Sequence, residues 1–238
     1  MKKLLGFSIF LVFVLIASLT AEAKVTLPAI FSDNMVLQQN TQVNVWGKAA
    51  PGEKVTVKAS WLDKAVTAKA AANGKWTVKL KTPKAITNQS VTVSGENEIT
   101  INNVLIGEVW LCTGQSNMEF PVSRHPDVKW NTGMLNEAEE LKDADYPEIR
   151  LFHVKHQLAH EGELDDCEGE WLVCNPKNLY DFSAVGFVFG RKLYKELKMP
   201  VGLIQSTWGG THAESWTKLD VMKKNPLYAD VLKDFALE

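Results

Sequence analysis

The sequence has few cysteines, few histidines and no excess of charge of one sign. It holds 3 cysteines and 5 histidines in 238 residues, and 26 basic residues stand against 28 acidic ones. The basic residues form no cluster, so the chain lacks the electrostatic footprint of a nucleic-acid-binding protein. No internal repeat or low-complexity tract is evident. Nucleic acid is therefore not expected as a partner, and at most one disulfide can form.

The cysteines leave two alternatives open. Cys167 and Cys174 flank a short segment that could close as a loop, and in an oxidising compartment they are the plausible disulfide pair. The alternative is that they stay unpaired. Cys112 lies inside an apolar run and is expected to pack as a small hydrophobic side chain. A cysteine nucleophile is disfavoured because Leu111 and Thr113 beside it offer no base.

The N-terminus has the pattern of a secretory signal peptide. Lys2 and Lys3 precede an uncharged apolar run over 4–19, and Ala21-Glu-Ala23 forms a small-x-small cleavage site. The apolar run is shorter than the ~20 residues of a usual membrane span. We therefore expect a signal peptide at 1–23, cleavage after Ala23, a periplasmic or secreted product, and no stable membrane anchor after cleavage.

Short stretches of alternating apolar and polar residues predict antiparallel strands between residues 24 and 103. Turn signals at Pro51-Gly52, Asn73-Gly74 and Ser94-Gly95 separate them, which favours a small β-sandwich. The strands are expected at Gln42–Trp46, Lys54–Ala59, Lys75–Leu80 and Ser90–Ser94.

Three tryptophans in this region permit two interpretations. Trp46, Trp61 and Trp76 could form the binding face of a carbohydrate-binding module. We favour the alternative that they fill the core, because Trp46 and Trp76 follow the period of their apolar neighbours.

From residue 104 the pattern changes to that of an α/β domain. Apolar runs at Val104–Cys112, Asp145–Val154 and Pro200–Gln205 predict buried strands. The segment from Ser183 to Leu197 has apolar residues at helical spacing, with Ser183 as the N-cap. Strands that alternate with a helix indicate a parallel sheet covered by helices.

Two polar turns follow two of these strands. Gly114-Gln-Ser-Asn117 comes after the first, and Trp208-Gly-Gly-Thr211 comes after the last. The carboxyl ends of parallel strands share one edge, so the turns should meet there. A serine needs a base and oxyanion donors to act as a nucleophile, and glycines expose backbone N–H groups that can serve as donors. Ser116 is therefore the candidate nucleophile.

Four motifs in order resemble the sialate O-acetylesterases and related bacterial carbohydrate acetylesterases of the SGNH-like hydrolase group. The resemblance covers nearly the whole mature chain and implies an N-terminal antiparallel β-sandwich followed by an α/β flavodoxin-like hydrolase domain over 104–238. It also implies removal of acetyl groups from O-acetylated carbohydrates, without a cofactor or a metal. The motifs are Phe31-Ser-Asp-Asn-Met-Val-Leu-Gln38, Gly107–Met118, Phe182-Ser-Ala-Val-Gly186, and Pro200–Thr211 with Glu214 and Trp216.

The resemblance also assigns roles to the residues of the two turns. Ser116 is the implied nucleophile, its own N–H is one oxyanion donor, and the turn of Gly209 and Gly210 supplies the second. Residues that shape the pocket are Gln115, Asn117, Thr211, His212 and Glu214.

The base that the resemblance calls for is missing. Relatives carry a catalytic histidine in an Asp-x-x-His type motif and a Gln-Gly-Glu type segment before it, and these 238 residues contain neither. His212 adjoins the second turn and is the remaining candidate, whereas His125 lies in a polar loop. His153, His156 and His160 are expected on a strand and a solvated loop rather than around a metal, because neighbouring strand positions diverge. We expect an incomplete hydrolase domain with little turnover by itself; the alternative is a non-catalytic glycan-binding protein with a defective or truncated hydrolase domain.

Overall fold

The computed structural model describes residues 24–126, 133–159 and 162–235. The expected signal peptide at 1–23 and His160 lie outside these residues. Across the described ranges, no helix has the length and apolar character needed to cross a bilayer.

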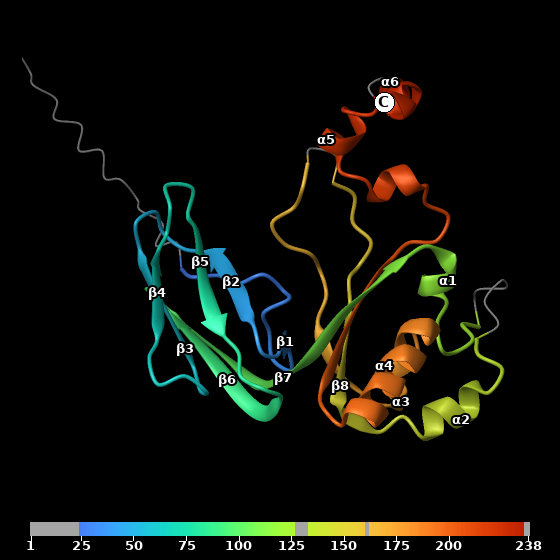
Figure 1. Ribbon diagram of the computed structural model, residues 1–238, viewed down its shortest axis with the longest axis horizontal. Helices are drawn as coiled ribbons and strands as arrows, with labels where there is room; N and C mark the ends of the chain where they lie inside the picture. The colour runs from blue at the N-terminus through green and yellow to red at the C-terminus, as the bar shows by residue number, and fades with distance from the viewer. Residues whose placement is uncertain (1–23, 127–132, 160–161, 236–238) are drawn as a thin grey trace, which may run out of the picture.

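The chain forms a mixed α/β structure, which confirms the mixed class expected from the sequence. A large mixed sheet of eight strands runs through the molecule, and a separate sheet holds two antiparallel strands, β2 and β5 (Figure 1). The strands are β1 Val36–Gln38, β2 Gln42–Lys48, β3 Lys54–Ala59, β4 Val66–Lys69, β5 Lys75–Lys81, β6 Ile86–Ser94, β7 Glu98–Gly114, β8 Tyr146–His153, β9 Trp171–Cys174 and β10 Val201–Thr207. The helices are α1 Ser116–Glu119, α2 Glu137–Lys142, α3 Pro176–Leu179, α4 Ala184–Leu197, α5 Leu219–Met222 and α6 Ala229–Phe235, with 3-10 turns η1 Ala213–Trp216 and η2 Pro226–Tyr228.

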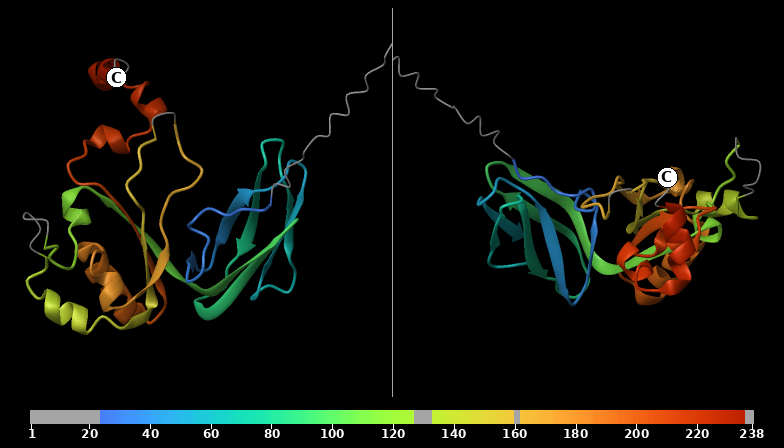
Figure 2. Two further views of the ribbon diagram at one scale, coloured as in Figure 1. Left: turned by 180° about the vertical axis from the view of Figure 1, so that it is seen from behind. Right: turned by 90° about the horizontal axis from the view of Figure 1, so that it is seen from above.

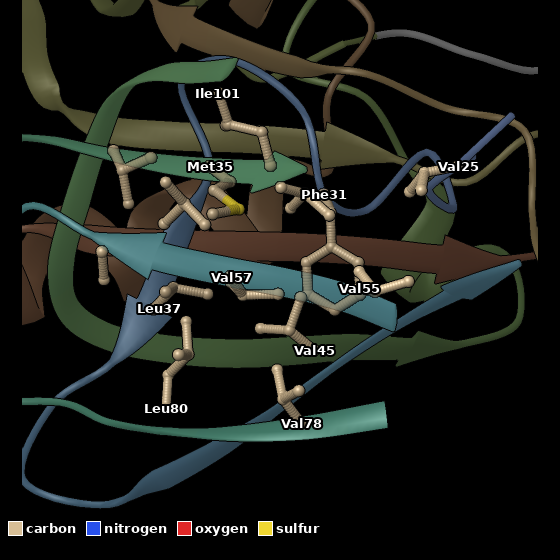
Figure 3. Packing of buried hydrophobic residues seen from close by; sticks show 14 of the residues in the cluster. Val25, Phe31, Met35, Leu37, Val45, Val55, Val57, Val78, Leu80 and Ile101 are labelled. Carbon is tan, nitrogen blue, oxygen red and sulfur yellow. The ribbon is translucent and has the colours of Figure 1, made fainter. Parts of the chain in front are cut away.

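In the N-terminal part, the two-stranded sheet packs on the part of the large sheet that holds β3, β4, β6 and β7. Alternate side chains point inward from both sheets, as the period of two in their sequences requires. Figure 3 shows Val45, Val78 and Leu80 facing Val55 and Val57 across this core, and all five are buried. The expected turns at Gly52 and Gly74 have positive φ angles of 81° and 76°, a region that glycine enters without strain.

One strand, β7, belongs to both parts of the molecule. Its first half pairs antiparallel with β6, and its second half pairs parallel with β10. Figures 1 and 2 show it crossing from one part to the other, with the carboxyl end beside α1. The change of pattern predicted at residue 104 falls inside this strand, which continues through the position without a break.

The crossing point of β7 is held by the segment before it in sequence. β1 pairs parallel with Leu105–Gly107, and Gln38 accepts from Val109 N–H at 2.9 Å. The Gln39 amide donates to the Glu108 carboxylate, also at 2.9 Å. At Gly107 the start of β10 comes so close that a Cβ would lie 2.0 Å from the carbonyl oxygen of Pro200. Only glycine leaves room for this approach. The approach brings the start of β10 alongside β7.

Beyond the crossing, the sheet has the order β7-β10-β8-β9. The first three strands are parallel, as expected, and the antiparallel edge strand β9 was not foreseen. Helix α4 covers this part of the sheet, and a Cβ at Gly190 would lie 2.5 Å from Leu203, which shows how closely the helix packs on β10. Ser183 caps α4 as predicted, because its hydroxyl accepts from Gly186 N–H at 3.0 Å.

The expectation that all three tryptophans fill the core was wrong for Trp46. Trp76 is buried, with 2% of its surface exposed, whereas Trp46 is 38% exposed. Val45 points into the core, and its strand neighbour Trp46 must then point outward. The rings of Trp46 and Phe31 pack edge to face, with 4.6 Å between their centroids. Trp61 is half-buried, and its indole N–H donates to Lys81 O at 3.0 Å.

The expected disulfide between Cys167 and Cys174 is absent, and all three cysteines are free thiols in the described chain. Cys174 ends β9 inside the core beneath α4, whereas Cys167 packs against the separate core of the N-terminal part. Most of strand β9 lies between the two cysteines in sequence, and their side chains pack in different cores. Cys112 is buried, as expected of a small hydrophobic side chain.

We expect Gly107→Ala to destabilise the protein by about 3 kcal/mol, because the new methyl group would overlap backbone that cannot move without separating β7 from β10. Urea unfolding followed by circular dichroism measures the loss. The control Thr77→Ala, on the exposed face of β5, should stay within about 0.5 kcal/mol of the wild type. Equal stability of the two variants would contradict the close approach.

Thiol labelling should follow burial. Burial raises the pKa of Cys174 to about 12 and also raises the pKa of Cys112, so both are thiols at pH 8 and react poorly. Desolvation raises the pKa of Cys167 as well, but this side chain is only half-buried and should be alkylated first. Mass spectrometry of the native chain and of the denatured, unreduced chain tests this. A mass increase of three alkyl groups after denaturation is expected, and two missing groups would indicate the disulfide.

Candidate active site

Ser116 lies on a sharp turn between β7 and α1. The strand ends at Gly114, and Ser116 is the first residue of α1, where Met118 N–H and Glu119 N–H both donate to Gln115 O at 3.0 Å. Gly114 has a φ angle of 154°, and its Cβ position lies 3.2 Å from Met118. The Ser116 side chain is exposed. A strand, a tight turn and a helix therefore present this hydroxyl at the carboxyl edge of the parallel sheet.

The second turn lies directly beside Ser116. Parallel pairing aligns Thr207 with Gly114, and Trp208 N–H donates to Gly114 O at 3.1 Å. A Cβ built on Gly209 would lie 3.1 Å from Ser116 Oγ. Ser116 and Gly209 are 93 positions apart in sequence, and the geometry brings their turns into contact as the shared edge of the sheet predicts.

An open hollow of about 540 Å³ adjoins the serine. Its lining consists of Gly114, Gln115, Ser116, Asn117, Met118 and Val185. Asn117 thus lies where the sequence analysis expected a residue that shapes the pocket. Most of the lining comes from the turn itself, so the hydroxyl is accessible to a ligand in this hollow.

Hydrogen bonds connect the two turns and stiffen the second. The Gln115 amide donates to Thr211 O. The Thr211 hydroxyl donates to Trp208 O at 2.7 Å and accepts from the indole N–H of Trp216 at 2.8 Å. Gln115 and Thr211 therefore hold the turns together.

Two residues at the site, Glu119 and His156, were not predicted from the sequence. The Glu119 carboxylate accepts from Gly209 N–H and lies 3.0 Å from His156 Nε2. The His156 ring stacks on the Trp208 indole, with 4.2 Å between centroids and 4° between planes. His156 was expected in a solvated loop, but these contacts hold it against the second turn. No sequence pattern pairs Glu119 with His156, because the loop after β8 folds back over the sheet edge.

None of the histidines in the described ranges is hydrogen-bonded to the Ser116 hydroxyl. The His212 side chain is exposed at the N-cap of η1, and its backbone oxygen accepts from Ser215 N–H at 3.1 Å. Glu214 lies within η1 and is half-buried. His153 ends β8, and desolvation, followed by the neighbouring His156, lowers its pKa. His153 is thus mainly neutral at pH 7 and adds little positive charge to the site.

Beneath the site, one buried polar side chain ties the helix to the sheet. Gln205 on β10 is fully buried. Its side-chain oxygen accepts from Ser183 N–H at 2.7 Å, and its amide donates to the Thr207 hydroxyl at 3.0 Å. The sequence placed Gln205 at the end of a strand but gave no sign of this role. It fixes the start of α4 relative to the strand that leads into the second turn.

Within the described residues, no group of three or more histidine, cysteine, aspartate or glutamate side chains is arranged to hold a metal ion. His156 contacts Glu119 and Thr207, and His153 is the last residue of β8. The functional groups at the site are the Ser116 hydroxyl, backbone N–H groups of the two turns, and the side chains of Glu119 and His156.

Gln115→Ala should loosen the second turn, because it removes the side-chain bond to Thr211 O. We expect amide hydrogen exchange in residues 208–212 to speed up several-fold, with the strand residues of β10 unchanged. The control is Asn117→Ala, which lines the same hollow from the same turn. Unchanged exchange in the Gln115 variant, or equal acceleration in both, would contradict the bridging role.

Comparison with known proteins shows consistent relationships over most of the chain. The family described as "Carbohydrate esterase, sialic acid-specific acetylesterase" matches residues 106–237. The chain is 33% identical to the sialate O-acetylesterase of Mus musculus in an alignment that covers 82% of this chain and 38% of the mouse protein. It is 31% identical to the sialate O-acetylesterase of Homo sapiens over 78% of this chain and 37% of the human protein.

A solved structure agrees with the sequence comparisons. A carbohydrate acetylesterase from Xanthomonas citri superimposes with a TM-score of 0.74 and 31% sequence identity, covering 84% of this chain and 44% of that chain. The chain therefore spans less than half the length of these relatives. The matched family region holds both turns of the site, and the chain belongs to the sialic acid-specific acetylesterase family of carbohydrate esterases.

Proposed function

We propose that the chain carries the nucleophile of an exported carbohydrate O-acetylesterase of the sialate O-acetylesterase type. The observation that carries this proposal is the contact between an exposed serine hydroxyl and the Gly209 turn at the carboxyl edge of a parallel sheet. The names of the mouse, human and Xanthomonas relatives support an acetylated sugar as the substrate. The signal-like sequence of residues 1–23 supports export to the periplasm or beyond.

The proposed reaction proceeds through an acyl-enzyme. Ser116 Oγ attacks the acetyl carbonyl carbon and loses its proton to a base, and the carbonyl oxygen becomes an oxyanion. As this tetrahedral intermediate collapses, the C–O bond to the sugar breaks and the protonated base returns its proton to the departing sugar oxygen, which leaves an acetyl-serine. Water then hydrolyses the acetyl-serine to acetate and free Ser116. Ser116 N–H, at the first position of α1, is one donor to the oxyanion, and the Gly209–Gly210 turn supplies the second. This route requires neither a metal nor a cofactor.

We further propose the domain arrangement that the family implies. Residues 24–103 form an antiparallel β-sandwich, and residues 104–238 contribute to a flavodoxin-like SGNH hydrolase domain. The facing sheets of the N-terminal part and the parallel order of β7, β10 and β8 support this arrangement. The superposition on the Xanthomonas esterase supports it as well.

We propose that further polypeptide completes the active site along β7. From Trp110 onward, β10 is the only described strand that pairs with β7, so the opposite edge of this part of the strand has no pairing strand in the described residues. Open edges and large exposed apolar patches are normally covered in a soluble protein. Large apolar side chains near this edge are exposed on β7 and α4, namely Trp110, Leu111, Val185, Val188 and Phe189. Val185 also lines the hollow beside Ser116, so polypeptide docked here would reach the serine and could bring the missing base.

A glycan-binding protein without turnover is the second candidate function. It is favoured by one observation, that no described histidine contacts the nucleophile. Such a protein would keep the hollow and its affinity for acetylated sugars but would not form an acyl-enzyme. Covalent labelling of the serine separates the two candidates.

The chain by itself should hydrolyse p-nitrophenyl acetate about 10²- to 10⁴-fold more slowly than the full-length Xanthomonas citri acetylesterase assayed in parallel, because a general base contributes roughly that factor. A fluorophosphonate should still label Ser116 slowly, and Ser116→Ala should abolish the labelling. Intact-protein and peptide mass spectrometry locate the adduct.

Two results would contradict parts of this proposal. Turnover close to that of the Xanthomonas enzyme, abolished by Ser116→Ala, would show that a base within the described chain, such as His212, is sufficient. An unlabelled serine in a chain that nevertheless binds acetylated sugar would favour the binding protein over the esterase.

A further inference from the structure

We propose that Glu119 is a positioning residue, whose carboxylate holds Gly209 N–H and His156 together and thereby leaves Gly210 N–H as the oxyanion donor of the second turn. The consequence for catalysis rests on the proposed esterase function, whereas the positioning itself does not. Glu119 lies on α1, three residues after the nucleophile, so it faces the second turn from the same short helix as Ser116.

The contacts of Glu119 reach both sides of the second turn. One carboxylate oxygen accepts from Gly209 N–H, and the other lies 3.0 Å from His156 Nε2. The Glu119 side chain is 22% exposed, so these bonds are partly shielded from water. A carboxylate that accepts a backbone N–H and binds an imidazole makes stronger hydrogen bonds than a neutral acceptor would.

The position of His156 fixes the proton on its ring. Nε2 lies 2.8 Å from Thr207 O, and a carbonyl oxygen can only accept. Nε2 must therefore carry a hydrogen, which it donates to Thr207 O, while the Glu119 carboxylate lies beside the same nitrogen. Stacking on Trp208 holds the ring parallel to the indole of the turn. His156 thus acts as a brace between β10, the turn and Glu119.

This arrangement distinguishes the two glycines. Gly209 N–H is already bonded to a carboxylate, so it is not free to stabilise a developing oxyanion. A Cβ at Gly210 would meet no atom within 4 Å, and its φ of 78° turns the backbone into a conformation suited to glycine. Gly210 N–H is therefore the donor that the turn can offer, and Glu119 sets its position by anchoring the preceding residue.

Nuclear magnetic resonance on the intact chain tests the positioning without any need for turnover. In the wild type we expect slow exchange of the Gly209 amide and an Nε2–H tautomer of His156, read from its ring ¹⁵N shifts. Glu119→Ala should speed Gly209 exchange at least tenfold. Glu119→Gln keeps an acceptor for Gly209 N–H but loses the charge that binds His156, so it should retain most of the protection. Glu139→Gln, an exposed residue on α2, is the matched control and should change nothing.

The wild-type chain labelled by a fluorophosphonate tests the assignment of the donor. The phosphonyl oxygen stands in for the oxyanion, so the Gly210 amide proton should move downfield on labelling while Gly209 keeps its shift. The labelling rate should fall in Glu119→Ala and recover in Glu119→Gln.

Each contrary outcome has one meaning. Rapid Gly209 exchange in the wild type, or equal exchange in Glu119→Ala and the control, overturns the positioning role. A downfield shift at Gly209 instead of Gly210 overturns the assignment of the donor. If the wild-type serine takes no label at all, the proposed esterase function fails, while the exchange data still decide whether Glu119 holds the turn.

Discussion

The structure depends on the course of strand β7. Its first half closes the core of the N-terminal part, and its second half lies beside β10 and ends at the turn that carries Ser116. The middle of the strand is held by side-chain hydrogen bonds, which Gln38 makes to Val109 N–H and Gln39 makes to Glu108. It is also held by the close contact of Gly107 with Pro200. A single extended segment thus connects the core of the N-terminal part to the candidate site.

The parallel register of β7 and β10 then sets the geometry of the site. Because Thr207 lies opposite Gly114, both strands end at the same level and their turns touch. Side-chain hydrogen bonds stabilise this contact. Gln115 bridges the two turns, and Thr211 stiffens the second turn. Glu119, which lies beside His156, accepts from Gly209 N–H. Backbone pairing therefore places the Ser116 hydroxyl against the second turn, while none of these contacts supplies a proton acceptor for that hydroxyl.

Local chemistry explains which features could be predicted from the sequence. Alternation and turn glycines located β2, β3 and β5, the Ser183 cap marked the start of α4, and the shared sheet edge brought Ser116 to Gly209. Trp46 was misplaced because a strand with valines at 43 and 45 must point residue 46 outward, an alternation that outweighs hydrophobicity. The roles of Glu119, His156 and Gln205 depend on loops and helices meeting in three dimensions, and no spacing in the sequence encodes those meetings. The cysteine pair looked close along the chain, but the strand between them separates their side chains into two cores.

Cross-linking tests most directly the central claim that the hydroxyl of Ser116 lies against the Gly209 turn. Disulfides require Cβ atoms about 3.5–4.5 Å apart. The double variant Ser116→Cys and Gly209→Cys should therefore oxidise to a cross-link, detected by peptide mapping without reduction. The pair Ser116→Cys and Ser215→Cys, with the second cysteine in η1, serves as the comparison and should stay reduced. If the cysteines at 116 and 209 remain free thiols after oxidation, the contact between Ser116 and the Gly209 turn is contradicted.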